Sequence, residues 1–197
     1  MNAAPLWQQR ALTDTRPSPW KNGGGTTREL LAWPAPDDWT VRMSVAQVDA
    51  DGPFSRFEGI TRWFAVLSGA GVRLHMRDTD QHHSLDRSSA PLQFDGALAL
   101  DCQLQDGPTQ DFNLMVRSLR HQRTRMRRVR GALDLQGLRP SLLAVWANTA
   151  PASIEGPNPT SLRIAPGTLA WTLCATPAPQ HALVVRGADA LLMEISL

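Results

Sequence analysis

The chain has 197 residues, a formal net charge of +2 and a hydrophobic fraction of 42%, which are ordinary values for a soluble globular protein. Its two cysteines are too few for a disulfide framework and favour a reducing compartment. We find no signal-peptide pattern and no run of about 18 apolar residues, so we expect a cytoplasmic protein that makes no membrane contact.

Short apolar segments rich in Val, Leu, Trp and Phe are separated by 15 prolines and 14 glycines. Each segment has the length of a strand and is bounded by turn residues, and no long segment holds a clean helical period. In chain order, the predicted strands are Thr40–Val48, Trp63–Leu67, Gly71–Met76, Ala97–Leu104, Asp111–Ser118, Ser141–Ala147, Thr168–Ala175, Ala182–Arg186 and Ala190–Leu197. The pattern predicts an all-β protein, folded as a sandwich or a barrel.

A weak internal similarity recurs at an offset of about seventy to eighty residues. Phe64–Leu67 resembles Leu143–Trp146, and Asp111–Val116 resembles Ala190–Ile195. A duplicated small β-unit would produce such offsets, so we expect two β-domains. The polar residues within predicted strands are concentrated in the first half, where we therefore expect the functional site.

Three consecutive glycines, Gly23–Gly25, precede a dense polar run in which Thr26 and Arg28 alternate with Thr27 and Glu29. Glycine removes every side chain from the bend, so the backbone can approach a partner closely or adopt positive φ. Both a small-ligand site and a tight hairpin leading into a polar strand fit this pattern. The spacing matches neither a P-loop nor a dinucleotide fingerprint, which excludes nucleotide binding at this segment.

Alternate residues of a strand face opposite sides of its sheet. Arg42 and Ser44 share one face of a predicted strand, and Asp111 and Asn113 share one face of another. Turned inward, these faces would line a pocket; turned outward, they would be ordinary solvated surface. A buried guanidinium can grip a carboxylate through two parallel hydrogen bonds, so this set suits a small amino-acid-like ligand. Phe54, in a turn, is either a core residue or the apolar wall of that pocket.

Seven arginines lie between Arg117 and Arg130, with no acidic residue among them. No aromatic residue interleaves with them, so we do not expect nucleic-acid binding. The arginines either belong to a strand that pairs with acidic neighbours on the same fold, or they form an interface with a partner protein. Charge reversal at Arg125 and Arg127 would test the interface. The five histidines form no His-x-His motif followed by Glu, and His82 and His83 would point apart on a strand. We therefore expect no metal and no other cofactor.

Several motifs together resemble the HutD/Ves family in order and spacing. They are Trp20–Glu29, Arg42–Ala46, Asp51–Ser55, Gly59-Ile60, Arg62, Gly69 and Asp111–Met115, within roughly residues 17–118. The resemblance implies a cupin-like jelly roll with two small β-barrels in one chain, a bicupin without the usual cupin metal ligands. It also implies an association with bacterial histidine utilisation, binding of a small carboxylate such as a formylated glutamate, and no established catalysis. Thr61 departs from the family, which commonly has an acidic residue before the equivalent of Arg62.

On this basis we expect residues 1–118 to form a barrel with a ligand pocket and residues 119–197 to form a structural barrel. The expected ligand-binding residues are Asn22, Thr26, Arg28, Glu29, Arg42, Ser44, Phe54, Asp111 and Asn113. Arg42 or Arg28 would clamp the carboxylate of a metabolite in a regulatory or sensing role. The alternatives are a metal-free isomerase or hydrolase with Glu29 or Asp111 as general base, and a regulatory partner protein. The sequence leaves open whether the protein forms a homodimer.

Overall fold

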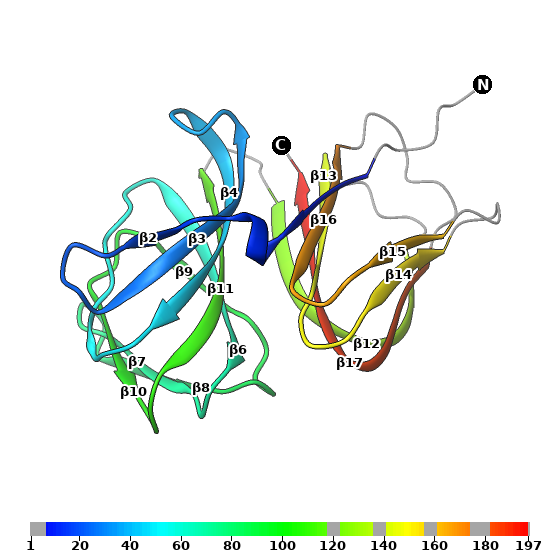
Figure 1. Ribbon diagram of the computed structural model, residues 1–197. Coiled ribbons are helices and arrows are strands. Elements are labelled where there is room, and N and C mark those ends of the chain that lie inside the picture. The colour runs from blue at the N-terminus through cyan, green and yellow to red at the C-terminus, as the bar shows by residue number, and fades with distance from the viewer. Residues whose placement is uncertain (1–6, 118–122, 136–140, 156–160, 174–181, 197) are drawn as a thin grey trace. The chain divides into compact units, whose positions relative to one another are not determined.

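The computed structural model describes residues 7–117, 123–135, 141–155, 161–173 and 182–196, with the side chains of 186–188 outside the description (Figure 1). Within these ranges the chain is almost entirely β-strand, with one short 3-10 turn, η1 (Leu12–Asp14), and no α-helix. The all-β prediction is therefore confirmed. None of the described helical segments is long and apolar enough to cross a membrane.

The chain divides into two compact units. The first unit is Thr15–Leu119, and the second unit combines Met1–Asp14 with Arg120–Leu197. The expected division was residues 1–118 and 119–197, and the difference arises at the N-terminus. Strand β1 (Gln8–Ala11) pairs with β16 (Thr168–Leu173), which ties the start of the described chain to the second unit by backbone hydrogen bonds.

The first unit consists of two antiparallel sheets. Its strands are β2 (Pro17–Pro19), β3 (Gly25–Pro34), β4 (Trp39–Val48), β5 (Gly52–Pro53), β6 (Ile60–Ser68), β7 (Val72–Met76), β8 (Gln81–Leu85), β9 (Leu92–Asp95), β10 (Leu100–Leu104) and β11 (Thr109–Arg117). Six of them form one sheet in the order β2-β3-β4-β11-β6-β9, and the other four form a second sheet in the order β5-β10-β7-β8.

The second unit contains one large antiparallel sheet. Besides β1 and β16, its strands are β12 (Arg123–Asp134), β13 (Leu142–Ala147), β14 (Ala152–Glu155), β15 (Leu162–Ile164) and β17 (Ala182–Ser196). The sheet follows the order β1-β16-β13-β17-β14-β15, and β12 also pairs with β17. The two predicted strands Ala182–Arg186 and Ala190–Leu197 thus belong to one long strand.

The weak internal similarity corresponds to equivalent positions in the two large sheets. The similar segments lie in β6 and β13 and in β11 and β17, and β6 pairs with β11 as β13 pairs with β17. The order β4-β11-β6-β9 in the first unit matches β12-β17-β13-β16 in the second. The repeated strand order supports the predicted duplication.

The inner face of the six-stranded sheet changes character along its strands. Ala46 and Val48 of β4 pack with Phe64 and Val66 of β6 in the apolar core of the first unit, against residues of the four-stranded sheet such as Leu74. Because side chains alternate with a period of two, Arg42 and Ser44 lie on the same face of β4 as Ala46 and Val48. The same face is therefore hydrocarbon at one end and polar at the other.

The glycine run forms a tight hairpin turn between β2 and β3. The Trp20 amide donates to the Gly25 carbonyl at 2.9 Å, and the Gly23 amide, with φ of 72°, donates to the Trp20 carbonyl at 3.0 Å. A Cβ atom on Gly25 would lie 2.2 Å from the Gln47 carbonyl oxygen of β4. The bare backbone at Gly25 therefore lets β3 approach β4, while the turn itself carries polar side chains.

We expect Gly25→Ala to destabilise the protein by about 2 kcal/mol, because a backbone carbonyl cannot move away without breaking sheet hydrogen bonds. Thermal and denaturant unfolding of the two variants Gly25→Ala and Gly24→Ala measure this. Gly24→Ala is the matched control, since its Cβ would meet its nearest neighbour, the Asn22 side chain, at an ordinary 3.5 Å. Equal unfolding midpoints for the two variants would contradict the argument.

Candidate functional site

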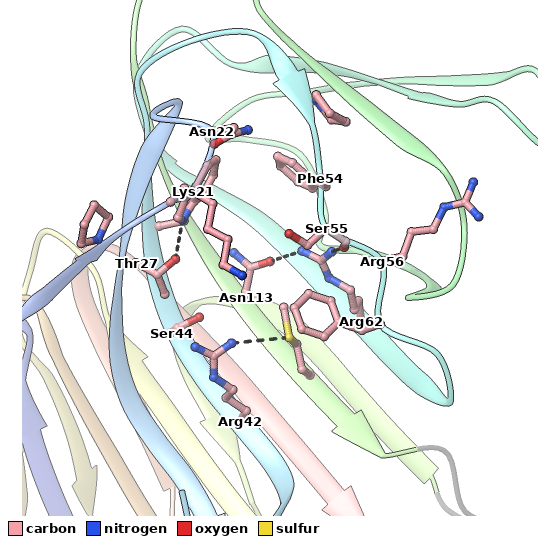
Figure 2. A pocket seen from close by; sticks show the side chains of 16 residues that line it. Lys21, Asn22, Thr27, Arg42, Ser44, Phe54, Ser55, Arg56, Arg62 and Asn113 are labelled. Carbon is pink, nitrogen blue, oxygen red and sulfur yellow. Dashed lines mark hydrogen bonds between the residues drawn. The ribbon is translucent and has the colours of Figure 1, made fainter. Parts of the chain in front are cut away.

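A cleft of about 620 Å³ opens at the polar end of the first unit (Figure 2). One part of its wall is apolar and includes Trp20, Phe54, Phe57 and Met115. Its polar wall contains the cations Lys21, Arg42, Arg56 and Arg62 and the neutral groups Thr27, Ser44, Asn22, Ser55 and Asn113. No carboxylate is among the residues that line this cleft, so its potential is positive.

Arg62 of β6 is the most buried cation of the cleft, with 5% of its surface exposed. Its Nη2 donates to Asn113 Oδ1 at 2.9 Å, and its Nη1 donates to the Ser55 carbonyl at 3.2 Å. Its guanidinium carbon lies 5.4 Å from the ring centre of Phe54, with the Phe57 and Phe94 rings at similar distances. Such rings stabilise a cation through their π-electrons.

The charge of Arg62 has no acidic partner among the described residues. Both of its hydrogen-bond acceptors are neutral, and its buried Nε has no acceptor. Burial, and secondarily repulsion by Arg42, lower the pKa of Arg62 to about 10, so the group stays protonated at neutral pH. A buried and uncompensated cation is costly, and an anion bound beside it would remove much of that cost.

Arg42 of β4 is oriented by a carboxylate that lies outside the cleft lining. Its Nε donates to Glu29 Oε2 at 2.7 Å, and its Nη1 lies 4.0 Å from Met115 Sδ. Because Glu29 holds the Nε side, the Nη groups face the cleft. In Figure 2, Arg42, Lys21 and Asn113 converge on one space, whereas Arg56 extends away from it.

The hairpin turn forms one rim of the cleft. Asn22 Oδ1 accepts a hydrogen bond from the Gly24 amide at 3.1 Å, and Trp20 Nε1 donates to Thr27 Oγ1 at 2.7 Å. The Trp20 ring also meets Phe54 edge-on, with centroids 6.3 Å apart. These contacts fix the turn against the wall, so the cleft is largely formed before a ligand enters.

The structure brings five of the nine expected residues together. Asn22, Arg42, Ser44, Phe54 and Asn113 line the cleft, while Thr26, Arg28, Glu29 and Asp111 do not. Strand alternation separates Thr26 and Arg28 from Thr27, which does line it. Arg28, one of the two expected clamps, instead donates to the Thr15 carbonyl.

Several lining residues were not among the expected ligand-binding residues, and the most important of these are Lys21, Thr27, Arg62 and Met115. Met115 shares the face of Asn113 in β11, and Arg62 is its partner across the β11–β6 pair. The period of two was visible in the sequence. Which of its two faces points inward depends on the pairing register, which the sequence alone does not supply.

Asp111 lies deeper than the cleft and is completely buried. Thr109 Oγ1 donates to its Oδ2 at 2.8 Å, but Oδ1 has no hydrogen-bond partner. Burial raises the pKa of Asp111 to about 7, against the opposing effect of the Thr109 hydrogen bond. Asp111 also contributes to raising the pKa of the buried, free Cys102 to about 12, although burial is the larger cause. Cys174 lies outside the described residues.

Part of the arginine-rich segment is neutralised by the second unit itself. Arg127 forms an ion pair with Glu194 at 3.0 Å, and Arg128 pairs with Asp189. Both acidic residues lie on β17, the strand that pairs with β12. For these two arginines, the structure shows the pairing with acidic neighbours that was one of the alternatives.

The comparisons with known proteins agree on one family. The HutD family model matches residues 12–188. Protein Ves of Escherichia fergusonii is 35% identical over 100 residues, which cover 50% of this chain and 51% of that protein. An uncharacterized 21.2 kDa protein in the hutC 3' region of Pseudomonas putida is 34% identical over 105 residues, covering 52% and 54%. In these matches the chain spans about half the length of each relative.

Solved structures match over nearly the whole chain. A conserved protein of unknown function from Pseudomonas aeruginosa has a TM-score of 0.86 at 29% identity, covering 98% of this chain and all of that one. HutD from Pseudomonas fluorescens has a TM-score of 0.84 at 23% identity, covering 97% and 98%. Bacillus subtilis oxalate decarboxylase has a TM-score of 0.63 at 8% identity, covering 100% and 78%. The distant likenesses show the fold alone, and they confirm the predicted cupin-like architecture.

The raised pKa of Asp111 predicts a pH dependence of stability. As the pH rises above the ordinary value of 3.8, the unfolded chain loses this proton while the folded protein keeps it until about pH 7. The contribution of Asp111 to the free energy of unfolding is thus fully present below pH 4 and is lost as the pH rises through 7. The loss amounts to about 4 kcal/mol at most. Asp111→Asn should flatten this decline and exceed wild type in stability at pH 8, as measured by urea unfolding across pH.

The control is Asp106→Asn, which removes an exposed carboxylate from a loop of the same unit and should reproduce the wild-type curve. If Asp111→Asn and wild type show the same pH profile of unfolding free energy, Asp111 does not hold a proton in the folded state.

Proposed function

The chain belongs to the HutD family, and we propose that the cleft of its first unit binds a small carboxylate metabolite. The observation that carries the proposal is the buried charge of Arg62. This guanidinium is held by Asn113 and the Ser55 carbonyl, both neutral, and has no acidic partner among the described residues. A carboxylate in the cleft would supply the missing counter-charge through charge-assisted hydrogen bonds.

The remaining charges of the cleft support the same ligand class. Lys21 and Arg42 add positive charge beside Arg62, and no carboxylate lines the wall to compete with an incoming anion. Glu29 neutralises part of Arg42 but also fixes the direction of its guanidinium. A fixed guanidinium loses less freedom on binding, which favours affinity.

The size and walls of the cleft favour a small molecule with an apolar or planar body. A volume of about 620 Å³ falls within the range of about 300–1,000 Å³ that is usual for small-molecule sites. Trp20, Phe54 and Met115 offer apolar surface beside the polar groups. The ligand would therefore place its carboxylate at the arginines and its body against the rings.

The biological role that we propose is sensing or buffering of a cytoplasmic metabolite of histidine or amino-acid catabolism. The family resemblance supports this setting, and the Pseudomonas putida relative is named for its position in the hutC 3' region. Urocanate, N-formylglutamate and N-formiminoglutamate are therefore the first ligands to test, with formate as a minimal carboxylate.

The alternative is a metal-free isomerase or hydrolase that uses Glu29 or Asp111 as a general base. A carboxyl group with a pKa of about 7, like that of Asp111, would suit proton transfer at neutral pH. Neither residue lines the cleft, however, and Glu29 is already paired with Arg42. We therefore favour binding, and product formation from any of these compounds by chelator-treated protein would favour the enzyme.

Calorimetric titration of the purified full chain should detect one of these carboxylates at one site per chain. We expect Arg42→Gln and Arg62→Gln each to weaken binding at least about tenfold, because a hydrogen bond to a charged group contributes about 1.5–3 kcal/mol. Arg73→Gln removes the same charge from an exposed position of β7, away from the cleft lining, and should leave the affinity unchanged.

No binding of any of these compounds at millimolar concentration would reject this ligand class. Equal losses in Arg42→Gln and Arg73→Gln would mean that net charge, rather than the cleft, attracts the anion. Circular dichroism of each variant separates a loss of binding from a loss of folding.

A further inference from the structure

A group of side chains suited to metal binding lies on the β7–β8 hairpin, apart from the cleft lining. His75 and His82 occupy directly paired positions of the two strands, and their rings stack 4.2 Å apart at an interplanar angle of 8°. Asp80, in the connecting turn, places Oδ1 3.0 Å from His75 Nε2 and 3.8 Å from His82 Nε2. We propose that these three side chains form a surface site for a divalent late transition-metal ion, with zinc as the first candidate.

The spacing of the three ligand atoms fits such an ion. Bonds of about 2.0–2.1 Å in a tetrahedral zinc site place the ligand atoms about 3.4 Å from one another. Here the ligand atoms all lie within 4.8 Å of one another, and the two imidazole–carboxylate distances fall on either side of that separation. Small side-chain rotations would therefore admit the ion. Two imidazoles and a carboxylate match the borderline softness of zinc and leave its fourth position open to water or another ligand.

The backbone brings these three residues next to one another without an ion. β7 is an interior strand of its sheet, between β10 and β8, and its inward residues Val72 and Leu74 are completely buried. His75 must therefore face outward from a well-anchored strand. Asp80 has a φ of 52°, and among the described residues it is the one non-glycine residue with positive φ. Aspartate tolerates this conformation, and the Asp80 carboxylate lies near both paired histidines.

The charges around this position are of both signs, since the exposed Arg73 shares the outward face of β7 with His75. Asp80 is 88% exposed at its side chain and accepts from no arginine or lysine among the described residues. The neighbouring Arg77 is paired with Asp101 at 3.3 Å, and Asp101 lies opposite His75 on β10. The two imidazoles thus lie near the carboxylates of Asp80 in the turn and Asp101 on β10, and the cation Arg77 is already paired.

The sequence did not reveal this site because the two histidines are seven residues apart and meet only through strand pairing. His82 and His83 were expected to point apart, and in the hairpin their partners are indeed different: His82 pairs with His75, and His83 pairs with Leu74. The sequence pattern compared the two adjacent histidines only with each other, so the pairing of His82 with His75 was missed. The adjacent histidine supplies a matched control on the same strand.

Zinc binding to the full chain tests the proposal, using protein freed of any polyhistidine tag and stripped with a chelator. Calorimetry and competition with a chromophoric zinc chelator should both report one ion per chain with micromolar or tighter affinity. His82→Ala and Asp80→Asn should each weaken binding at least about tenfold. Asp80→Asn tests the carboxylate without demanding a new backbone conformation, because asparagine also accepts positive φ.

His83→Ala should bind zinc like wild type, and so should Arg42→Gln, which alters the carboxylate cleft alone. Wild-type protein that fails to compete with the chelator would overturn the proposal. Unchanged affinity in a folded His82→Ala variant, or an equal loss in His83→Ala, would overturn it as well, since either result places the zinc elsewhere on the chain.

Discussion

Arg62 lies inside the first unit with Asn113 and the Ser55 carbonyl as its acceptors and three phenylalanine rings around it. Keeping a buried charge costs several kcal/mol, and each ring returns about 0.5–2 kcal/mol. The arrangement holds only if β6 and β11 keep their register. A slip of one residue would move Arg62 and Asn113 to the other face of the sheet and carry every core residue of these strands with them. The apolar core and the cationic cleft therefore depend on the same strand pairing.

Much of the fold followed from the sequence because strand length, turn residues and apolar content are local properties. Strands β4, β6, β7, β11 and β13 appear close to their predicted positions. The short strands β1, β2 and β8 were missed, since they carry few apolar residues and are defined by the partners that they pair with. The assignment of the residues before Thr15 to the second unit was missed for the same reason. Their strand β1 pairs with β16, which lies more than 150 residues further along the chain.

The site was predictable as a set of motifs but not as a geometry. The period of two correctly grouped Arg42 with Ser44 and Asp111 with Asn113, yet Asp111 lies below the cleft because it is one step deeper in the barrel. On β3 the alternation is regular from Gly25 to Glu29, so counting separates Thr26 and Arg28 from Thr27, but only the pairing with β4 shows which of the two faces points inward. The second unit repeats the strand order but fills its core with residues such as Leu143, Val145 and Leu192. The same architecture thus carries a polar cleft in one copy and a hydrocarbon core in the other.

The choice of arginine at position 62 has a consequence for how the cleft responds to acidity. A lysine starts from a lower intrinsic pKa, so an equal loss of hydration would bring it much closer to neutrality. Arginine starts from 12.5 and still retains its proton up to about pH 10. This charge is therefore constant across every pH that a living cell tolerates. Arg62 itself therefore adds no acid dependence to anion binding, which leaves the ionisation of the ligand and that of Asp111, with its pKa of about 7, as the sources of any such dependence.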